Sequence, residues 1–271
     1  YTHTFAEPNS WVDEKGIEHL VDKEIKRVQN TLVDRFAPLA KGTKEKIVKQ
    51  LLATQRKKDC LDRDDIRLGC ETYRIAYRDI AASTNERALI ASILPPGIVC
   101  GNKCPVQIPL RTKEDINKQM LAGESLSSLL YEKTMTPKEQ CFAAGILNSF
   151  LLDFIIRKKI TTTLNMFYMY QLPVPRYSDG DPYFAEIAER SARLICSEPR
   201  FAELAAEVSV PVETLAPEKR QELQNEIDAY AAKIYGFKVD DLAYVLAAFP
   251  LVKQEIKDGV LAAFVRLGDA T

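Results

Sequence analysis

The most constraining feature of this sequence is an apolar segment, residues 137–159, that begins with a helix-start signal. Thr136 can cap a helix, and Pro137 suits a first helical turn. Large apolar side chains then surround the helix axis at Phe142, Ile146, Leu147, Phe150, Leu151, Phe154 and Ile155. Such a helix is stable only when other groups cover it, and the run of about 18 apolar residues that a membrane span needs is absent. The sequence therefore predicts one long helix buried inside a protein core, and no association with a membrane.

The residues that follow this helix are polar: Lys158, Lys159, Thr161, Thr162, Thr163 and Asn165. Cations at the C-terminal end of a helix offset its dipole, which accounts for both lysines without any function. The dipole does not account for Thr161, Thr163 and Asn165. Hydroxyl and amide groups beside cations are common contacts to nucleic-acid phosphates, so this turn is a candidate DNA-backbone site.

The remaining segments predict an α+β fold. Helical spacing of apolar residues occurs over 14–36, 43–55, 123–132, 182–196, 199–208, 217–235, 239–248 and 250–265. Short alternating or apolar runs at 73–80, 88–94, 98–100 and 106–110 predict an antiparallel sheet or meander. The aromatic stretch 165–172, closed by Pro173 and Pro175, is expected to be extended.

These elements suggest three consecutive domains. Residues 1–70 form a helical connector. Residues 71–177 form a small antiparallel, β-rich domain that contains the long buried helix and is flanked by helices. The turn sequence Ser178-Asp-Gly-Asp181 separates it from an all-helical C-terminal segment, 178–271.

Charge is distributed unevenly over a chain whose net charge is −1. From Asp179 onward there are 17 acidic and 10 basic residues, a net charge of −7, so residues 1–178 carry about +6. Hydrophobic residues make up 46% and charged residues 28%, which favours a globular protein over a disordered one. The basic part of the chain suits an acidic partner such as nucleic acid, although a chance bias between two ordinary halves explains the charge equally well.

Residues typical of common enzymes are missing. The chain lacks a P-loop, a dinucleotide-binding glycine motif, a zinc-protease motif and a nucleophile elbow. Cys100 and Cys104 could supply half of a zinc site, but a second close cysteine pair is absent, so we expect no metal. The chain begins without methionine and without a signal-like segment, and we expect a cytoplasmic piece of a longer protein.

The β-rich region holds several further candidate DNA contacts. On the strand 73–80, Arg74 and Arg78 alternate with apolar residues, so both are expected to face solvent. Arginine suits phosphate or guanine, and asparagine suits adenine, so Asn85 and Arg87 on the next connector are candidate base contacts. Lys103 is a further candidate in the following loop. A solvated strand face and an ordinary turn explain the same residues without any function.

Several blocks occur in an order that resembles the C-terminal target-recognition region of adenine-specific DNA methyltransferases of the Type IIG restriction–modification and phage-defence kinds. The blocks are YRIAYRDIAASTNER (73–87), ILPPG (93–97), LNSF (147–150) with Asp153 and Arg157, LN (164–165), QLPVP (171–175), and the helical stretches 226–237 and 241–252. The resemblance covers roughly residues 70–255 and is weaker before residue 70.

The resemblance implies double-stranded DNA as the partner, together with an upstream methyltransferase domain in the parent protein. That domain would bind S-adenosylmethionine and carry an Asn/Asp-Pro-Pro-aromatic motif; here Pro95-Pro96 follows Leu94, so this chain is expected to hold no cofactor and no catalytic residues. The expected role is target recognition before adenine flipping, with a nuclease possible elsewhere in the parent. Two alternatives stay open: a protein-interaction domain that docks a nuclease or translocase, and a free-standing specificity subunit.

Overall fold

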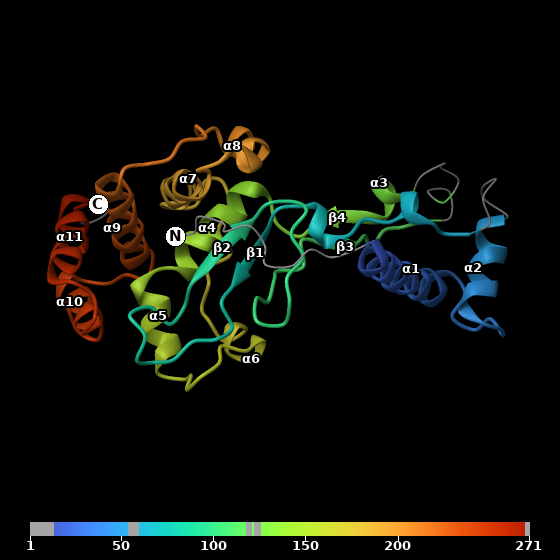
Figure 1. The fold of residues 1–271 in the computed structure, drawn as a ribbon, viewed down its shortest axis with the longest axis horizontal. Helices are drawn as coiled ribbons and strands as arrows, with labels where there is room; N and C mark the ends of the chain where they lie inside the picture. Colours follow the sequence, from blue (N-terminus) through green and yellow to red (C-terminus); the bar gives the residue numbers. More distant parts are fainter. Residues whose placement is uncertain (1–13, 54–59, 118–120, 122–125, 269–271) are drawn as a thin grey trace. The chain divides into compact units, whose positions relative to one another are not determined.

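A computed structural model describes residues 14–53, 60–117, 121 and 126–268. The protein has an α+β fold, as the sequence predicts, with helices predominating over two small antiparallel sheets (Figure 1). The described residues divide into two compact units. The smaller unit contains residues 14–53, 60–72, 108–117, 121 and 126–134, and the larger unit contains residues 73–107 and 135–268.

The smaller unit contains two amphipathic helices, a third, short helix and a two-stranded sheet. Its helices are α1 (Glu14–Phe36), α2 (Lys44–Ala53) and the short α3 (Ser127–Leu130), and its strands are β3 (Leu110–Thr112) and β4 (Tyr131–Lys133). Val28, Leu32 and Leu52 are fully buried in its core. The buried carboxylate of Asp65 accepts a hydrogen bond from the Leu126 amide at 3.1 Å, which joins the two chain segments of this unit.

The larger unit is built on a strand pair covered by helices. β1 (Arg74–Tyr77) and β2 (Ala91–Leu94) are antiparallel, with Arg74 opposite Leu94 and Tyr77 opposite Ala91. The helix α4 (Pro137–Leu147) packs against both strands and against α7 (Phe184–Ile195).

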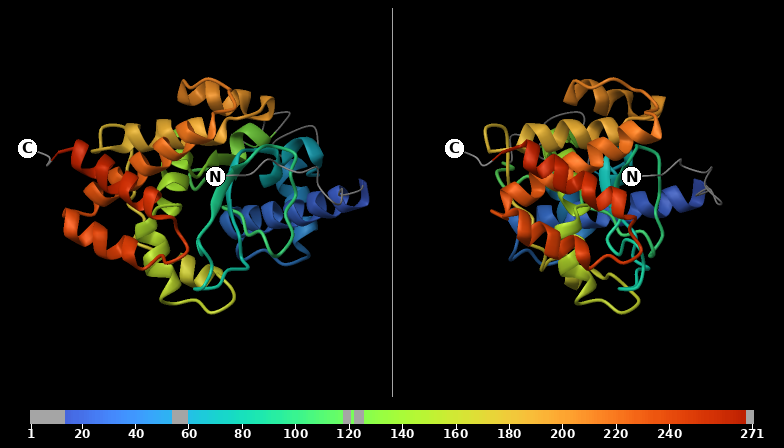
Figure 2. Two further views of the ribbon diagram at one scale, coloured as in Figure 1. Left: turned by 60° about the vertical axis from the view of Figure 1, so that its left-hand side comes forward. Right: turned by 90° about the vertical axis from the view of Figure 1, so that its left-hand side faces the viewer.

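The C-terminal helices extend this packing in an order that the sequence predicts well. They are α8 (Ala202–Val208), α9 (Pro217–Ile234), α10 (Val239–Ala247) and α11 (Gln254–Arg266). α9 lies between α7 and α11 (Figures 1 and 2). Gly236 ends α9 with φ +69°, a left-handed conformation that glycine adopts without steric cost, and this confirms the predicted helix end.

The single helix expected over 137–159 is two helices, so that prediction was wrong. α4 ends at Leu147, and α5 (Phe150–Arg157) begins after a bend of 57°. Ser149 caps α5 by accepting the Leu152 amide, and the Asn148 amide group donates to the carbonyl of Ala91 at 2.8 Å. Polar side chains that bond to β2 and to the helix start therefore interrupt an otherwise continuous apolar helix.

Other local predictions also changed in the folded chain. Residues 166–169 form a short helix, α6 (Met166–Met169), instead of an extended segment, because Asn165 caps it by accepting the Tyr168 amide at 3.3 Å. The segment expected to be helical over 123–132 ends in β4, which pairs with β3. Val106 forms only an isolated bridge to Ala76 and does not add a strand to the sheet. In place of the expected meander, the described residues of each unit contain one antiparallel pair of strands.

The two compact units group the chain differently from the three consecutive segments that the sequence suggested. Residues 108–117, 121 and 126–134 pack with the N-terminal helices, and residues 135–177 pack with the C-terminal helices. Pairing between β3 and β4 is a long-range contact that segment order alone does not reveal. Within the described ranges, no single helix is long and apolar enough to cross a membrane; the bent pair α4–α5 meets that criterion only in combination.

Replacing Gly145 with alanine is expected to destabilise the larger unit. An added Cβ would lie 2.3 Å from the Ser191 hydroxyl oxygen and 2.7 Å from the Ile187 methyl carbon on α7. The resulting separation of α4 and α7 should lower the free energy of unfolding by roughly 1–3 kcal/mol in urea denaturation. Gly101→Ala is the control, because no atom lies within 4 Å of its added Cβ. If the urea midpoint of Gly145→Ala equals that of the wild type, α7 moves away from the added methyl group without loss of stability, and the prediction is wrong.

Candidate nucleic-acid interface

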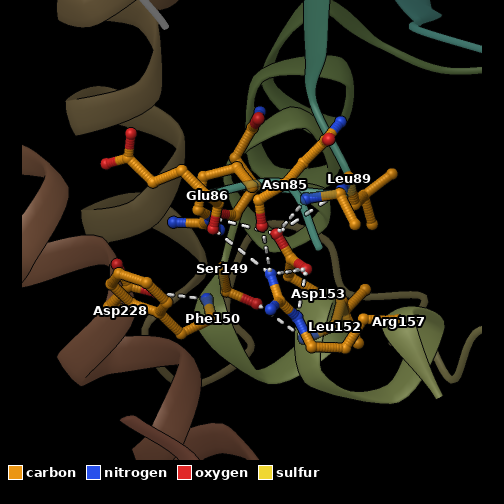
Figure 3. Close-up of polar contacts among 12 residues, drawn as sticks. Asn85, Glu86, Leu89, Ser149, Phe150, Leu152, Asp153, Arg157 and Asp228 are labelled. Carbon is orange, nitrogen blue, oxygen red and sulfur yellow. Dashed lines mark hydrogen bonds and ion pairs between the residues drawn. The ribbon is translucent and has the colours of Figure 1, made fainter. Parts of the chain in front are cut away.

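A buried carboxylate organises the polar residues around α5 (Figure 3). Asp153 is fully buried, and its Oδ2 atom accepts hydrogen bonds from Arg87 Nε at 2.9 Å and from the Ala88 amide at 2.9 Å. Its Oδ1 atom accepts Arg157 Nε at 3.1 Å and Nη2 at 3.0 Å. The Leu89 amide also donates to Oδ2, at 3.4 Å, so two guanidinium groups and two backbone amides satisfy one buried charge that desolvation would otherwise make costly.

Arg157 extends this network to the connector that follows β1. Its guanidinium donates to the carbonyls of Asn85 at 3.4 Å and Glu86 at 3.2 Å (Figure 3), and to the Ser83 carbonyl at 3.4 Å. The same group lies over the Phe249 ring, with 3.9 Å between the guanidinium carbon and the ring centroid. Arg157 thus holds the connector on α5 through backbone contacts that are independent of the connector's side chains.

Arg87 has a structural position instead of the predicted base-contacting one. Besides its ion pair with Asp153, it donates to the Asn148 carbonyl and lies over the Phe150 ring at 4.1 Å. Its hydrogen-bonding groups are directed into the bend between α4 and α5. Asn85 is half-buried on the same connector and contributes its carbonyl to Arg157.

A second buried carboxylate, Asp228 of α9, lies beside this network. Its Oδ1 atom accepts the Phe150 amide at 2.6 Å at the start of α5 (Figure 3). Burial raises the pKa of Asp228 to about 7, while the positive charge of Arg87 opposes that rise. Asp228 therefore exchanges a proton near neutral pH at the point where α9 holds α5.

Arg74 does not face solvent, contrary to the alternation on its strand. It is 2% exposed, and its guanidinium donates to the Ile98 carbonyl. Residues 98–107 return along β1: the Tyr77 amide donates to the Pro105 carbonyl at 3.1 Å, and the Gln107 amide to the Ile75 carbonyl at 2.7 Å. This segment lies along the edge of β1 that β2 leaves free, and all four residues of β1 are buried, including Arg74.

Arg78 is half-buried at the end of the same strand. Its Nη2 atom donates to the Arg87 carbonyl at 2.9 Å. Arg74, Arg78 and Arg87 therefore form no common basic surface, because each is directed at a backbone carbonyl inside the unit.

Three loops that are distant in sequence do come together at one end of the unit. The Ala81 amide donates to the Thr162 carbonyl at 3.2 Å, and the Leu164 amide donates to the Asp79 carbonyl at 2.7 Å, so residues 79–81 and 162–164 lie side by side. The Asp79 amide in turn donates to the Lys103 carbonyl at 3.2 Å. The Lys103 ammonium group is exposed and pairs with the Asp79 carboxylate at 3.2 Å.

The short helix α6 adds exposed aromatic side chains to this end. Phe167 is 68% exposed and Tyr170 is 79% exposed, and Ile80 on the adjoining loop is 57% exposed. The Tyr77 hydroxyl donates to the Met166 sulfur at 2.9 Å, which attaches α6 to β1. We call the set of exposed and half-buried residues at this end the α6 surface; its members are Ile80, Lys103, Lys159, Thr161, Thr163, Asn165, Phe167 and Tyr170.

The two lysines after α5 have different surroundings. The Lys159 ammonium group donates to the Gln171 side chain at 2.9 Å, next to the end of α6. The Lys158 ammonium group lies over the Phe154 ring at 4.8 Å and is not part of the α6 surface. Thr161 is exposed and Thr163 is half-buried.

The structure thus brings together five of the ten residues proposed from the sequence as DNA contacts. These are Lys103, Lys159, Thr161, Thr163 and Asn165. The sequence did not predict that Phe167 and Ile80 are exposed, because in an extended segment or a sheet it does not show which side chains face solvent. The only sequence signal for exposure was the presence of polar residues before and after the aromatic residues of this segment.

Comparisons with known proteins identify no relative. No family model matches the chain, and neither the curated proteins nor the solved structures contain a significant match. Within the described residues, no group of three or more His, Cys, Asp or Glu side chains is placed to hold a metal ion.

Replacing Arg87 with alanine is expected to lower stability. The change leaves the buried Asp153 carboxylate with Arg157 as its remaining guanidinium partner, and it removes the contact with the Phe150 ring. We expect a loss of roughly 2–4 kcal/mol in urea denaturation, somewhat below the cost of breaking a fully buried ion pair. Arg111→Ala, which breaks an exposed ion pair with Glu132, is the control and should change stability by less than about 1 kcal/mol. Equal effects of the two variants would contradict the structural role of Arg87.

Replacing Asp228 with asparagine is expected to change how stability depends on pH. The pKa of Asp228 is about 7 in the folded state and near 3.8 in the unfolded state, so the folded state binds the proton more tightly. Wild-type stability from this group is complete below about pH 4 and is lost as the pH rises to about 7. The asparagine variant should therefore gain stability relative to wild type between pH 4 and 7, by at most roughly 4 kcal/mol. Denaturant titrations at pH 5 and pH 8 measure the difference; an identical gap at both pH values would exclude it. Asp240→Asn, at an exposed position, is the control.

Proposed function

We propose that the larger unit binds double-stranded DNA through the α6 surface, as the target-recognition region of an adenine-specific DNA methyltransferase. The observation that carries this proposal is the exposure of Phe167 and Tyr170 beside Lys103 and Lys159 on loops that bond to one another. Exposed apolar groups that lie together beside polar residues are typical of binding surfaces. The motif order across residues 70–255 supports the same family.

The chemistry of the α6 surface suits a DNA duplex. Lys103 and Lys159 supply cations for phosphates, and the Thr161 hydroxyl and the Asn165 amide are of the kind that hydrogen-bond to phosphate oxygens. Phe167 and Tyr170 offer apolar faces that can pack on a base step opened when an adenine is flipped out. Phosphate contacts then position the chain, and side chains near α6 contact bases.

The internal network supports this function indirectly. Asp153, Arg87 and Arg157 hold α5 and the 83–89 connector together, and α5 leads directly into the turn 158–165. A turn attached to a rigid helix keeps its lysine and threonines at fixed separations, which phosphate recognition requires. Arg74 and Arg87 have no part in the proposed DNA contact because their guanidinium groups bond inside the unit.

The C-terminal helices favour a second candidate function, docking of a nuclease or translocase protein. Tyr244, Leu251 and Val265 are large exposed apolar residues in the part of the chain that carries a net charge of −7. A net negative charge disfavours association with DNA phosphates, so these residues suit a protein partner better than a nucleic acid. Duplex binding that is abolished by changes on α6 and unaffected by Leu251→Ser would favour the DNA function.

The DNA function predicts how affinity for a mixed-sequence duplex depends on salt. The variant Lys103→Ala with Lys159→Ala should weaken binding to all sequences alike and reduce the slope of log K against log salt by about one per lost phosphate contact. The variant Phe167→Ala with Tyr170→Ala should weaken binding at every salt concentration without changing that slope. Fluorescence anisotropy from low to moderate salt measures both effects.

The matched control for these variants is Lys253→Ala, which removes an exposed lysine next to α11. It should leave both affinity and slope unchanged. Sequencing of the bound fraction of a random duplex library should show an enriched site for the wild-type chain. Absence of binding at low salt, or equal losses in the control and the α6 variants, would refute the proposal.

A further inference from the structure

Two thiols meet in the loop that carries Lys103. Cys100 and Cys104 flank a tight turn in which the Cys104 amide donates to the Gly101 carbonyl at 3.0 Å. Both cysteines are half-buried and unbridged, and their side chains are hydrogen-bonded to each other. The turn therefore places the two thiols beside each other, and both are partly exposed to solvent.

A buried cation lies beside one of these thiols. The hydrogen bond with Cys104 and the positive charge of Arg74 lower the pKa of Cys100 to about 6, although partial burial acts in the opposite direction. The same hydrogen bond raises the pKa of Cys104. Arg74 is held in place by its bond to the Ile98 carbonyl, so the cation is a fixed part of the fold. One member of the pair is therefore suited to react as a thiolate, and the other stays a thiol.

The cysteines buried in the helical part of the larger unit have the opposite character. Cys141 and Cys196 are buried, and burial raises the pKa of both thiols, to about 12 for Cys196. Buried thiols with raised pKa values are inert. Cys60 is an exposed cysteine of the smaller unit. Among the described residues it has no thiol partner of this kind, so it serves as a reference for an exposed single cysteine.

We propose that Cys100 and Cys104 form an oxidation site at which peroxide converts the two thiols into a disulfide. The Cys100 thiolate attacks one peroxide oxygen, the O–O bond breaks, and water leaves after protonation, so Cys100 becomes a sulfenic acid. The Cys104 sulfur then attacks the Cys100 sulfur, the S–O bond breaks, and a second water leaves. The two thiols lose two electrons and two hydrogens, and one hydrogen peroxide is reduced to two waters.

A disulfide accounts for this pair better than a metal ion does. Within the described part of the chain, no third His, Cys, Asp or Glu joins the two cysteines, whereas structural zinc takes four ligands. Oxidation needs only the two thiols that flank this turn. Because Lys103 lies inside the ring that the bond closes, the disulfide also fixes the loop at the edge of the α6 surface; the oxidation chemistry itself does not depend on DNA binding.

The test treats the whole chain with a slight excess of hydrogen peroxide at neutral pH. Intact-mass measurement should show the loss of two hydrogens, and peptide mapping under non-reducing conditions should show Cys100 linked to Cys104. Cys100 should react roughly tenfold faster than Cys60, because the hydrogen bond with Cys104 and the charge of Arg74 favour the Cys100 thiolate. Dithiothreitol should restore the original mass.

Single variants separate the two roles. Cys104→Ser should stop at the sulfenic acid on Cys100, which dimedone traps. Cys100→Ser should form no intramolecular disulfide, and dimedone should label its Cys104 more slowly, because the Arg74 guanidinium is hydrogen-bonded to Cys100. Circular dichroism checks that both variants stay folded, and Cys60→Ser is the matched control that should form the disulfide at the wild-type rate. Oxidation of Cys60 as fast as Cys100, labelling of Cys104 in Cys100→Ser as fast as that of Cys100 in Cys104→Ser, or absence of the Cys100–Cys104 link would overturn the proposal.

Discussion

The larger unit depends on the buried carboxylate of Asp153. Two arginines and two backbone amides of the 87–89 segment converge on it from separate parts of the chain. A buried charge is costly unless it is paired and hydrogen-bonded, so the carboxylate favours one arrangement of α5 and the 83–89 connector over all others. The turn after α5 and the loops that bond to it take their positions from this arrangement.

Internal hydrogen bonds also change which charged residues can contact a partner. Arg74, Arg78 and Arg87 look like surface cations in the sequence, yet each donates to a carbonyl inside the unit. The groups left for DNA are Lys103, Lys159 and the hydroxyl and amide groups around α6, together with exposed Phe167 and Tyr170. The proposed interface is consequently smaller and more aromatic than the sequence suggested, and its acidic neighbour Asp79 moderates its charge.

Local signals predicted most helices of this protein. The helix over residues 14–36 and the C-terminal helices follow from apolar spacing and from Gly236, because these depend on neighbours within a few residues. The break at Asn148 was not predictable in this way, since the Asn148 side chain bonds to Ala91 in β2, far away in sequence. Among the candidate site residues, the turn 161–165 was identified because its polar groups follow directly after a buried helix.

By itself, the sequence determined the α+β class, the burial of the segment around Phe142 and Phe150, and a polar turn next to aromatic residues. Each follows from side-chain type and spacing along the chain. Only the tertiary structure decided that Arg74 and Arg87 are internal, that Cys100 lies against Cys104 and Arg74, and that Phe167 faces solvent. These outcomes depend on which distant segment covers a face, and alternation along one strand carries no information about that covering segment.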